Sequence, residues 1–379
     1  MTDAPFALIA GGGTGGHVIP GLAVADALVS GEFDKDRVLF VGAARGVEAE
    51  LVPEAGYAIE LLPGRGIQRR LTAQNLGAVW GLLVAVVRSF GIVRRTKPSV
   101  VVSVGGYAST GPSLAAVILR RPLVVLEQNA RAGASNRLFG RFARFCAVPF
   151  AETDLPHAKV TGNPVRPEIA TRASSRDRRR ARAEFGVADG RRMIAVFAGS
   201  LGASSVNQAV IGVVRRWSDR SDLHVHHVLG RRDFEALDPP DLSGDSIVYE
   251  AVEYERRMDE LLAAADLAVC RSGGTTVAEL AVVGVPAIFV PFPQAPRDHQ
   301  TANARPLAAA GAAVIVPDAE LDVDRLEREM AAILDDPGAA DDRLSSMSSA
   351  AHELGRPRAA AAIAELIHTE VLTGGDAHG

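Results

Sequence analysis

The sequence is poor in cysteine and in aromatic residues, and it contains no long hydrophobic segment. Two cysteines among 379 residues, Cys146 and Cys270, give neither a disulfide framework nor a metal-binding spacing, which indicates a reducing compartment such as the cytoplasm. No uncharged apolar stretch reaches the roughly 18 residues that a transmembrane helix needs. With 47% apolar and 23% charged residues, we expect a soluble globular protein that buries a sizeable core.

Neither sign of charge dominates the chain. It has 41 basic and 45 acidic residues and a net charge of −4, so no global field attracts nucleic acid and we expect no such partner. Two Asp-x-Asp strings, at residues 34–36 and 322–324, are of the kind that holds a divalent ion on a nucleotide sugar. We interpret the first as a charged turn and the second as a helix cap, and we predict no metal site and no cofactor.

Apolar runs that end in glycine or polar turns recur along both halves of the chain and predict buried parallel strands. These runs lie at residues 6–10, 38–41, 99–104, 123–126, 193–198, 223–229, 267–270 and 287–290. The pattern breaks near residues 163–164, which predicts two doubly wound α/β domains. We expect residues 1–163 to form an N-terminal domain and residues 164–349 a C-terminal one. Residues 350–379 would form a C-terminal helix that could pack back on the first domain. Ligands are expected in a cleft where the carboxyl ends of the two sheets face each other.

The 37 glycines have no three-residue period, which excludes collagen, and they cluster at the ends of these strands. Residues 11–16 satisfy the G-x-G-x-x-G pattern, whose backbone N–H groups can approach a phosphate at a helix start. A dinucleotide site would need an acidic residue at the end of the second strand, but residues 40–44 contain none and Glu48 comes too late. Tight strand–helix packing is the alternative, although Thr14 and His17 add polar groups that packing alone does not require.

His17 is the first candidate for a catalytic group. It lies at a predicted helix start, where the positive end of the helix dipole disfavours the imidazolium and keeps the ring available as a base. A structural histidine is the alternative. Residues 271–279 offer hydroxyl and N–H groups at another helix start, suited to a diphosphate, with Glu279 one turn on for ribose hydroxyls or as a first-turn acid. The turns at 105–109 and 199–202 are weaker signals, and the polar loop 291–303 could bind sugar hydroxyls or simply be a surface loop.

Taken together and in order, these motifs resemble the MurG family, the peptidoglycan transferases that add N-acetylglucosamine to a lipid-linked N-acetylmuramyl-pentapeptide. The matching strings extend over roughly residues 6–316. They are residues 12–17, 105–107, 127–129, 162–166, 199–203 with Asn207, 270–273 with Glu279, and 298–300 with Asn303.

The resemblance implies a GT-B fold in which the second domain mainly holds UDP-N-acetylglucosamine. It implies donor contacts at Thr14, Gly15, Gly16, Asn129, Arg166, Ser200, Glu255 (through its backbone), Gly274, Thr275, Thr276, Val277, Ala278, Glu279 and Gln300. It implies that the glycine turns of the first domain face the diphosphate of the acceptor, with candidates at Gly13, Gly105, Gly106 and Tyr107.

The activity implied is an inverting transfer to the 4-hydroxyl of undecaprenyl-pyrophosphoryl-N-acetylmuramyl-pentapeptide, lipid I to lipid II, with His17 as general base and without metal. This reaction belongs to cell-wall synthesis, and other cell-wall synthesis proteins are possible partners. A UDP-N-acetylglucosamine 2-epimerase and a non-catalytic sugar-nucleotide-binding protein are the alternatives.

Residues 76–87 form twelve consecutive apolar positions flanked by arginines, too short to span a bilayer. A buried helix is one interpretation. The other is a patch that dips into an anionic membrane surface, which an enzyme with a membrane-anchored acceptor would need. On that interpretation the protein is peripheral, at the cytoplasmic face of the cell membrane. The candidate patch residues are Leu76, Val79, Trp80, Leu82, Leu83 and Val86.

Overall fold

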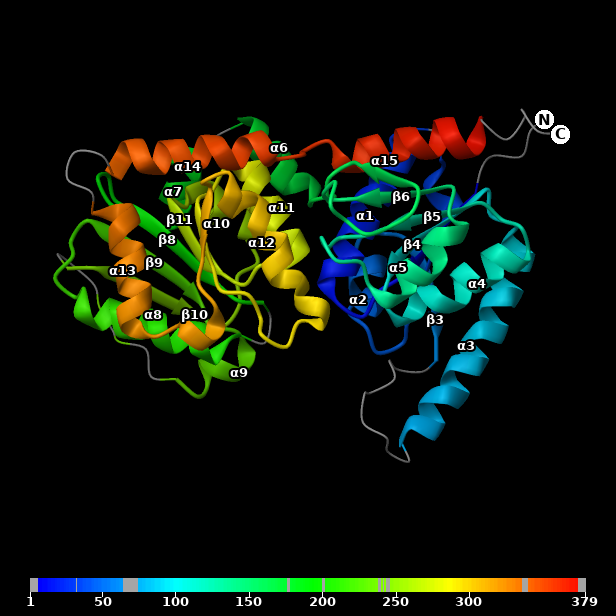
Figure 1. Ribbon diagram of the computed structural model, residues 1–379, viewed down its shortest axis with the longest axis horizontal. Helices are drawn as coiled ribbons and strands as arrows, with labels where there is room; N and C mark the ends of the chain where they lie inside the picture. The colour runs from blue at the N-terminus through cyan, green and yellow to red at the C-terminus, as the bar shows by residue number, and fades with distance from the viewer. Residues whose placement is uncertain are drawn as a thin grey trace. The chain divides into compact units, whose positions relative to one another are not determined.

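The computed structural model divides the chain into two compact units, each built around its own parallel sheet (Figure 1). The first unit comprises residues 1–166 and 356–379, and the second comprises residues 167–355. The structure describes residues 6–31, 33–63, 74–175, 178–199, 202–237, 240, 242, 246–335 and 340–373. Within these ranges the side chains of residues 74–80, 82, 172–175 and 340 are not described.

The first unit contains a seven-stranded sheet in the order β3-β2-β1-β4-β5-β6-β7, with every neighbouring pair parallel. The strands are β1 (Ala7–Gly11), β2 (Val38–Ala43), β3 (Ala58–Leu62), β4 (Val100–Gly105), β5 (Leu123–Leu126), β6 (Phe145–Val148) and β7 (Ala158–Val160). The order reverses between β1 and β4, and ligands of open α/β sheets bind outside the carboxyl ends of the strands at such a reversal.

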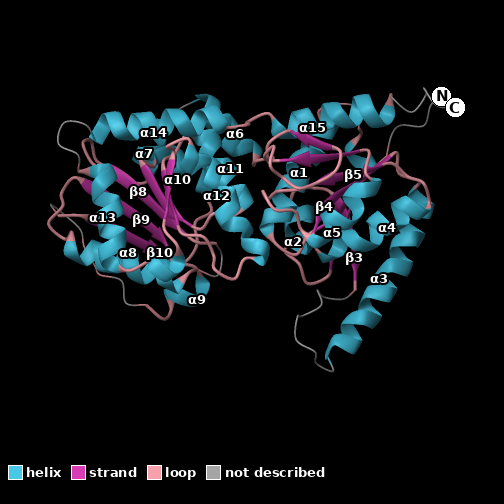
Figure 2. Cartoon of the chain, viewed as in Figure 1, coloured by secondary structure: helices cyan, strands magenta, loops and turns pink. Residues whose placement is uncertain are grey.

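Helices cover both faces of this sheet, as Figure 2 shows, because alternate residues of the buried strands point to opposite sides. Ile9 of β1 packs with the side of α1 and α15, whereas Leu8 packs with the side of α3, α4 and α5. Although α15 lies far from α1 in the sequence, it packs against α1 (Figure 1). The helices are α1 (Gly15–Val29), α2 (Glu48–Glu54), α3 (Gln74–Thr96), α4 (Thr110–Ile118), α5 (Ala134–Phe139) and α15 (Ala359–Ile367).

The second unit repeats this plan with a six-stranded parallel sheet in the order β10-β9-β8-β11-β12-β13. Its strands are β8 (Arg192–Phe197), β9 (Leu223–Val228), β10 (Val248–Val252), β11 (Leu267–Cys270), β12 (Ala287–Phe289) and β13 (Ala313–Ile315). The strand order reverses between β8 and β11, so both sheets present a reversal of the same kind. The two sheets confirm the predicted pair of doubly wound α/β units.

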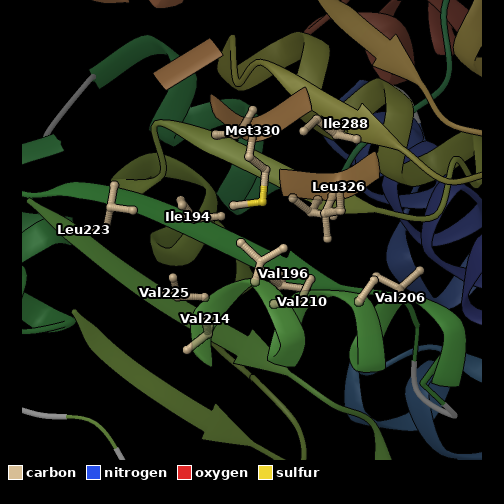
Figure 3. Packing of buried hydrophobic residues seen from close by; sticks show 14 of the residues in the cluster. Ile194, Val196, Val206, Val210, Val214, Leu223, Val225, Ile288, Leu326 and Met330 are labelled. Carbon is tan, nitrogen blue, oxygen red and sulfur yellow. The ribbon is translucent and has the colours of Figure 1, made fainter. Parts of the chain in front are cut away.

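The main core of the second unit lies between its sheet and the helices α8, α13 and α14. Figure 3 shows Met330 of α13 among side chains of the sheet, close to Ile194 of β8 and to Leu326. The other face carries α7, α10 and α11, and α11 also contacts α6 and α12. The helices are α6 (Pro167–Ser175), α7 (Arg178–Glu184), α8 (Ser204–Arg216), α9 (Arg231–Phe234), α10 (Met258–Ala264), α11 (Gly274–Val283), α12 (His299–Ala309), α13 (Val323–Leu334) and α14 (Ala340–Leu354).

One of the two Asp-x-Asp strings, at residues 322–324, begins a helix. Asp322 caps α13, since its carboxylate accepts a hydrogen bond from the backbone N–H of Arg325 at 2.7 Å, and this confirms the predicted cap. Within the described residues, no group of three or more His, Cys, Asp or Glu side chains is placed to hold a metal ion. Within the same residues, no helix is both long enough and apolar enough to cross a membrane.

Candidate active site

The glycine turns of the first unit pack backbone against backbone at the reversal between β1 and β4. Gly11, Gly12 and Gly13 have φ angles of 146°, 147° and 96°, and Gly106 has φ 79°. These angles favour glycine. A Cβ atom at Gly11 would overlap the carbonyl oxygen of Gly105, and one at Gly106 would overlap that of Gly12. Close packing of the two turns therefore accounts for the glycines at 11 and 106.

His17 lies in the first turn of α1, beside this pair of turns. The hydroxyl Oγ1 of Thr14 and the ring atom Nδ1 of His17 are 3.1 Å apart, within hydrogen-bond distance. Thr14 occupies the N-cap position of α1, yet its side chain makes no capping bond to the helix and pairs with the ring instead. The ring also lies against Gly105, where a Cβ atom would stand 3.2 Å from Cδ2 of His17.

This pairing bears on the tautomer of His17. When Nδ1 carries the hydrogen and donates it to Thr14, the other ring nitrogen, Nε2, holds a lone pair that can accept a proton. Thr14 is exposed and His17 is half-buried, so the pair lies at the solvent side of the loop. The arrangement can perform general-base chemistry on a hydroxyl brought to Nε2.

Glu48, the first residue of α2, lies behind the same loop and is only 1% exposed. Its carboxylate accepts hydrogen bonds from the backbone N–H of Gly13 at 2.8 Å and of Ala43 at 2.7 Å. The N–H of Gly13, an acceptor-side candidate, is thus directed inward to a carboxylate. The position of Glu48 in the sequence suggested only a ribose ligand, whereas its carboxylate binds the backbone of the glycine loop.

A second buried carboxylate organises the loop that follows β5. Glu127 is 2% exposed, and its Oε1 accepts from the backbone N–H of Asn129 at 2.9 Å and from the side-chain amide of Asn129 at 3.1 Å. Its Oε2 accepts from Gly133 N–H and from Nδ2 of Asn136, both at 2.9 Å. The donor candidate Asn129 is therefore fixed by Glu127. Arg166, another donor candidate, is half-buried at the end of residues 1–166 of this unit.

Tyr107 begins the short turn after β4. Its hydroxyl donates to the carbonyl oxygen of Pro63 at 3.5 Å, and burial raises the pKa of the phenol above its ordinary value. The side chain thus stays neutral at physiological pH and can act as a hydrogen-bond donor.

In the second unit, the turn between β11 and α11 brings the predicted helix start to the strand reversal. Gly273 is the N-cap residue, and Gly274, Thr275 and Thr276 in the first helical turn are half-buried. The next residues of the predicted segment differ in burial. Val277 and Glu279 are buried, at 1% and 5% exposed, and Ala278 is half-buried. The N–H groups of this first turn are suited to an anion.

The loop after β12 is tied to the same region by its polar side chains. Oε1 of Gln300 accepts a hydrogen bond from the backbone N–H of Phe292 at 2.8 Å, which leaves the amide nitrogen of Gln300 to act as a donor. Nδ2 of Asn303 donates to the carbonyl oxygen of Ser272 at 3.1 Å, just before α11. Asn303 therefore links α12 to the turn that begins α11.

Arg271, at the start of this turn, holds several segments together. Its guanidinium donates to the carbonyl oxygens of Val290 at 3.0 Å and Pro291 at 3.1 Å, and it forms an ion pair with Asp318 at 2.6 Å. A guanidinium with several fixed acceptors is part of the scaffold. Arg271 therefore supports the turns at the ends of β11 and β12.

Glu255, the candidate near the uracil, points its side chain inward and is 8% exposed. Oε1 accepts from the backbone N–H of Arg257 at 2.8 Å, while Oε2 lies 3.2 Å from Nε2 of His226. The carboxylate is thus occupied by contacts within the protein. The candidate contact of Glu255 with uracil would therefore be made by its backbone. Ser200, another donor candidate, lies outside the described residues.

A hydrogen-bonded chain centred on His227 lies on the face of β9 opposite to His226. Nδ1 of His227 is 2.9 Å from the hydroxyl of Tyr249, and Nε2 is 3.0 Å from Oδ1 of Asn207. Asn207 then donates from Nδ2 to the carbonyl oxygen of Leu229 and to Oδ2 of Asp233, both at 2.9 Å. Burial lowers the pKa of His227 to about 3, so the ring is neutral. The chain fixes the end of β9 next to the glycine turn that follows β8.

Helix α3 carries the predicted membrane patch. The side chains of Leu76, Val79, Trp80 and Leu82 lie outside those that the structure describes. Leu83 is 54% exposed, Val87 is 71% exposed and Val86 is half-buried. Other residues of the same helix, Ala85, Ile92 and Val93, pack into the core of the first unit. The described part of α3 therefore has one side in the core and also exposes apolar side chains to solvent.

Comparisons with known proteins agree on one family. The model of the glycosyltransferase family 28 N-terminal domain matches residues 7–148, and that of the C-terminal domain matches residues 193–363. The UDP-N-acetylglucosamine--N-acetylmuramyl-(pentapeptide) pyrophosphoryl-undecaprenol N-acetylglucosamine transferase of Salinibacter ruber is 40% identical over 367 residues, 96% of either chain. The transferase of the same name from Anaeromyxobacter dehalogenans strain 2CP-1 is 41% identical and covers 95% of this chain and 91% of its own.

Among solved structures, MurG of Acinetobacter baumannii has a TM-score of 0.74 at 27% identity, covering 96% of this chain and 99% of its own. A putative UDP-N-acetylglucosamine 2-epimerase of Listeria monocytogenes has a TM-score of 0.68 and covers 97% of each chain. Its identity is 17%, so this likeness shows the fold alone. The chain therefore belongs to glycosyltransferase family 28 and, within it, to the MurG family of N-acetylglucosamine transferases.

Proposed function

We propose that this chain transfers N-acetylglucosamine from UDP-N-acetylglucosamine to the 4-hydroxyl of lipid-linked N-acetylmuramyl-pentapeptide, the reaction that its relatives' names describe. The observation that carries the proposal is the Thr14–His17 pair at the exposed side of the glycine loop. A ring oriented through Nδ1 is what a base that takes the proton of a sugar hydroxyl at Nε2 requires.

The step is a single displacement. The 4-hydroxyl oxygen of the acceptor attacks the anomeric carbon of the donor as the bond from that carbon to the diphosphate oxygen breaks. His17 takes the hydroxyl proton at Nε2, and UDP leaves with the electron pair of the broken bond. Because attack and departure occur on opposite faces of the sugar, the configuration at the anomeric carbon inverts.

The second unit would hold the donor. The N–H groups of the first turn of α11 would receive the diphosphate and stabilise its negative charge as UDP leaves. Glu279 would accept hydrogen bonds from ribose hydroxyls, and the amide nitrogen of Gln300 would donate to the sugar. Further donor contacts proposed from the resemblance are Thr14, Gly15, Gly16, Asn129, Arg166, Ser200 and the backbone of Glu255. The acceptor-side candidates remain Gly13, Gly105, Gly106 and Tyr107.

We further propose that α3 brings the first unit to an anionic membrane, where the acceptor is anchored. Leu83 and Val87 are exposed and four residues apart, so they lie on the same face of the helix. Arg88, Arg94 and Arg95 are also exposed on α3 and could meet anionic headgroups. This supports peripheral attachment at the cytoplasmic face, where other cell-wall synthesis proteins would be neighbours.

The test supplies labelled UDP-N-acetylglucosamine and a lipid-linked muramyl acceptor to the purified protein, with and without EDTA. We expect label in the lipid fraction, unchanged by chelation, because Asp322 is used as a helix cap and Asp34 precedes a short turn before β2. Label released as free N-acetylmannosamine without acceptor would instead indicate an epimerase. Binding of the donor without any product would indicate a sugar-nucleotide-binding protein.

A further inference from the structure

A buried carboxylate lies directly behind the loop that carries the proposed base. Glu48 uses both of its oxygens on the backbone: Oε2 accepts from Gly13 at 2.8 Å and Oε1 accepts from Ala43 at 2.7 Å. Among the residues that the structure describes, Glu48 has no cationic partner. Its charge is stabilised by these two N–H donors and by its place at the start of α2.

Three glycines surround this carboxylate, and their lack of a side chain makes room for it. A Cβ atom at Gly12, Gly42 or Gly46 would overlap the side chain of Glu48. Gly12 also has a positive φ, but Gly42 and Gly46 do not. Backbone conformation therefore does not explain the glycines at 42 and 46, whereas room for the carboxylate does. The sequence around β2 is thus shaped to receive Glu48.

The contact to Gly13 fixes the segment that leads into Thr14 and His17. On the solvent side, Gly13 and Thr14 are exposed, whereas the N–H of Gly13 is drawn inward to Glu48. The preceding residue, Gly12, donates to the carbonyl oxygen of Gly105 at 3.4 Å. The loop is therefore held from behind at two successive residues, and its outer side is left to the Thr14–His17 pair.

We propose that Glu48 is a positioning residue for the transfer reaction: it holds the loop that presents Thr14 and His17, and it does not touch substrate. This inference rests on the proposed function. A carboxylate is required because both oxygens accept N–H groups, and an amide can accept with only one. An aspartate would be one methylene too short to reach both donors.

The first test compares Glu48→Gln with Glu50→Gln. Glu50 lies in the same helix and is exposed, so the control makes the same change in charge without touching the loop. For Glu48→Gln we expect kcat/KM for the lipid-linked acceptor to fall by about 100-fold, since a displacement of about 1 Å in a catalytic group has that effect. The Kd for UDP-N-acetylglucosamine, measured by calorimetry, should rise by less than about 10-fold, because α11 and Gln300 are untouched and only the proposed donor contacts of the loop, at Thr14, Gly15 and Gly16, are displaced. Equal acceptor kinetics for the two variants would overturn the proposal.

A second variant displaces the carboxylate without removing it. Gly46→Ala places a methyl group where Glu48 lies and introduces no positive φ, so it should reproduce the loss of acceptor kcat/KM. In a Glu48→Ala background that space is vacant, and Gly46→Ala should then cost less than about twofold. Fully additive losses would show that the two residues do not act through one contact and would overturn the proposal.

Amide hydrogen exchange separates this proposal from the proposed function, because it needs no activity. Peptides covering residues 7–20 should exchange faster in Glu48→Gln than in the wild type, and unchanged in Glu50→Gln. If the wild type transfers no sugar but this difference is present, the proposed function fails and the loop contact stands. If the wild type is active and exchange is equal in Glu48→Gln, the positioning role is overturned.

Discussion

His227 connects the pH of the solution to the stability of the second unit. Its ring lies between Tyr249 and Asn207, at 2.9 Å and 3.0 Å, and its pKa is lowered to about 3 by burial. An exposed histidine in the unfolded chain has a pKa of about 6.5. As the pH falls, the unfolded state therefore takes up a proton that the folded state does not, and acid favours unfolding.

The size of this effect follows from the two pKa values. Between pH 7 and pH 5, a group that titrates at about 6.5 only when unfolded lowers the free energy of unfolding by about 2 kcal/mol. His224 has a pKa lowered mainly by burial and adds to the acid sensitivity in the same direction. Comparing the wild type with His227→Gln, which keeps a polar group in the chain, isolates the contribution of His227.

Denaturant unfolding followed by tryptophan fluorescence provides the assay. Trp217 is buried in the second unit, so a Trp80→Phe background leaves one tryptophan and reports that unit alone. In this background, lowering the pH from 7 to 5 should reduce the free energy of unfolding. We expect the reduction to be about 2 kcal/mol larger with His227 present than with His227→Gln. An equal pH dependence in the two proteins would refute a neutral, buried His227.

Three further expectations concern the site and the membrane face. Thr14→Val should lower kcat by roughly 2- to 10-fold, the worth of one hydrogen bond, and Thr14→Ser should restore it, in steady-state kinetics with the lipid acceptor; equal loss in both variants would count against the tautomer argument. Gln300→Ala should weaken donor binding by a similar factor in calorimetry, and an unchanged Kd would remove Gln300 from the donor site. Leu83→Asp with Val87→Asp should reduce sedimentation with anionic vesicles while leaving transfer to a detergent-solubilised acceptor intact, and undiminished sedimentation would exclude α3 as the membrane contact.

All inner strands of the two sheets except β6 could be predicted from the sequence, whereas the edge strands could not. Continuous apolar runs identified β1, β2, β4 and β5 and their counterparts β8, β9, β11 and β12, because strands buried on both faces carry apolar residues at nearly every position. Four of the unpredicted strands, β3, β7, β10 and β13, lie at sheet edges, and β7 is exposed at every residue. The fifth, β6, is an inner and buried strand of only four residues. An edge strand has one neighbour and little burial, so it leaves no apolar run to read.

In the candidate site, features that depend on neighbouring residues could be predicted, whereas contacts between residues far apart in the sequence could not. Gly11 and Gly106 could be recognised as turn glycines, but their contact joins residues far apart in the sequence, so the choice between a packing and a ligand-binding role stayed open. Glu48 was judged by its distance from β2 alone, and its bond to Gly13 spans 35 positions. The nearby Gly42 and Gly46, neither with a positive φ, were the available signal that a side chain needed their space.

The role of His17 is the central claim, and one comparison tests it most directly. Turnover with labelled UDP-N-acetylglucosamine and saturating lipid-linked acceptor is measured for the wild type and for His17→Ala, together with the donor Kd of each. Loss of a general base should lower kcat by about 10²- to 10⁴-fold, with donor affinity preserved because the second unit is unaltered. Turnover equal to that of the wild type would contradict the account.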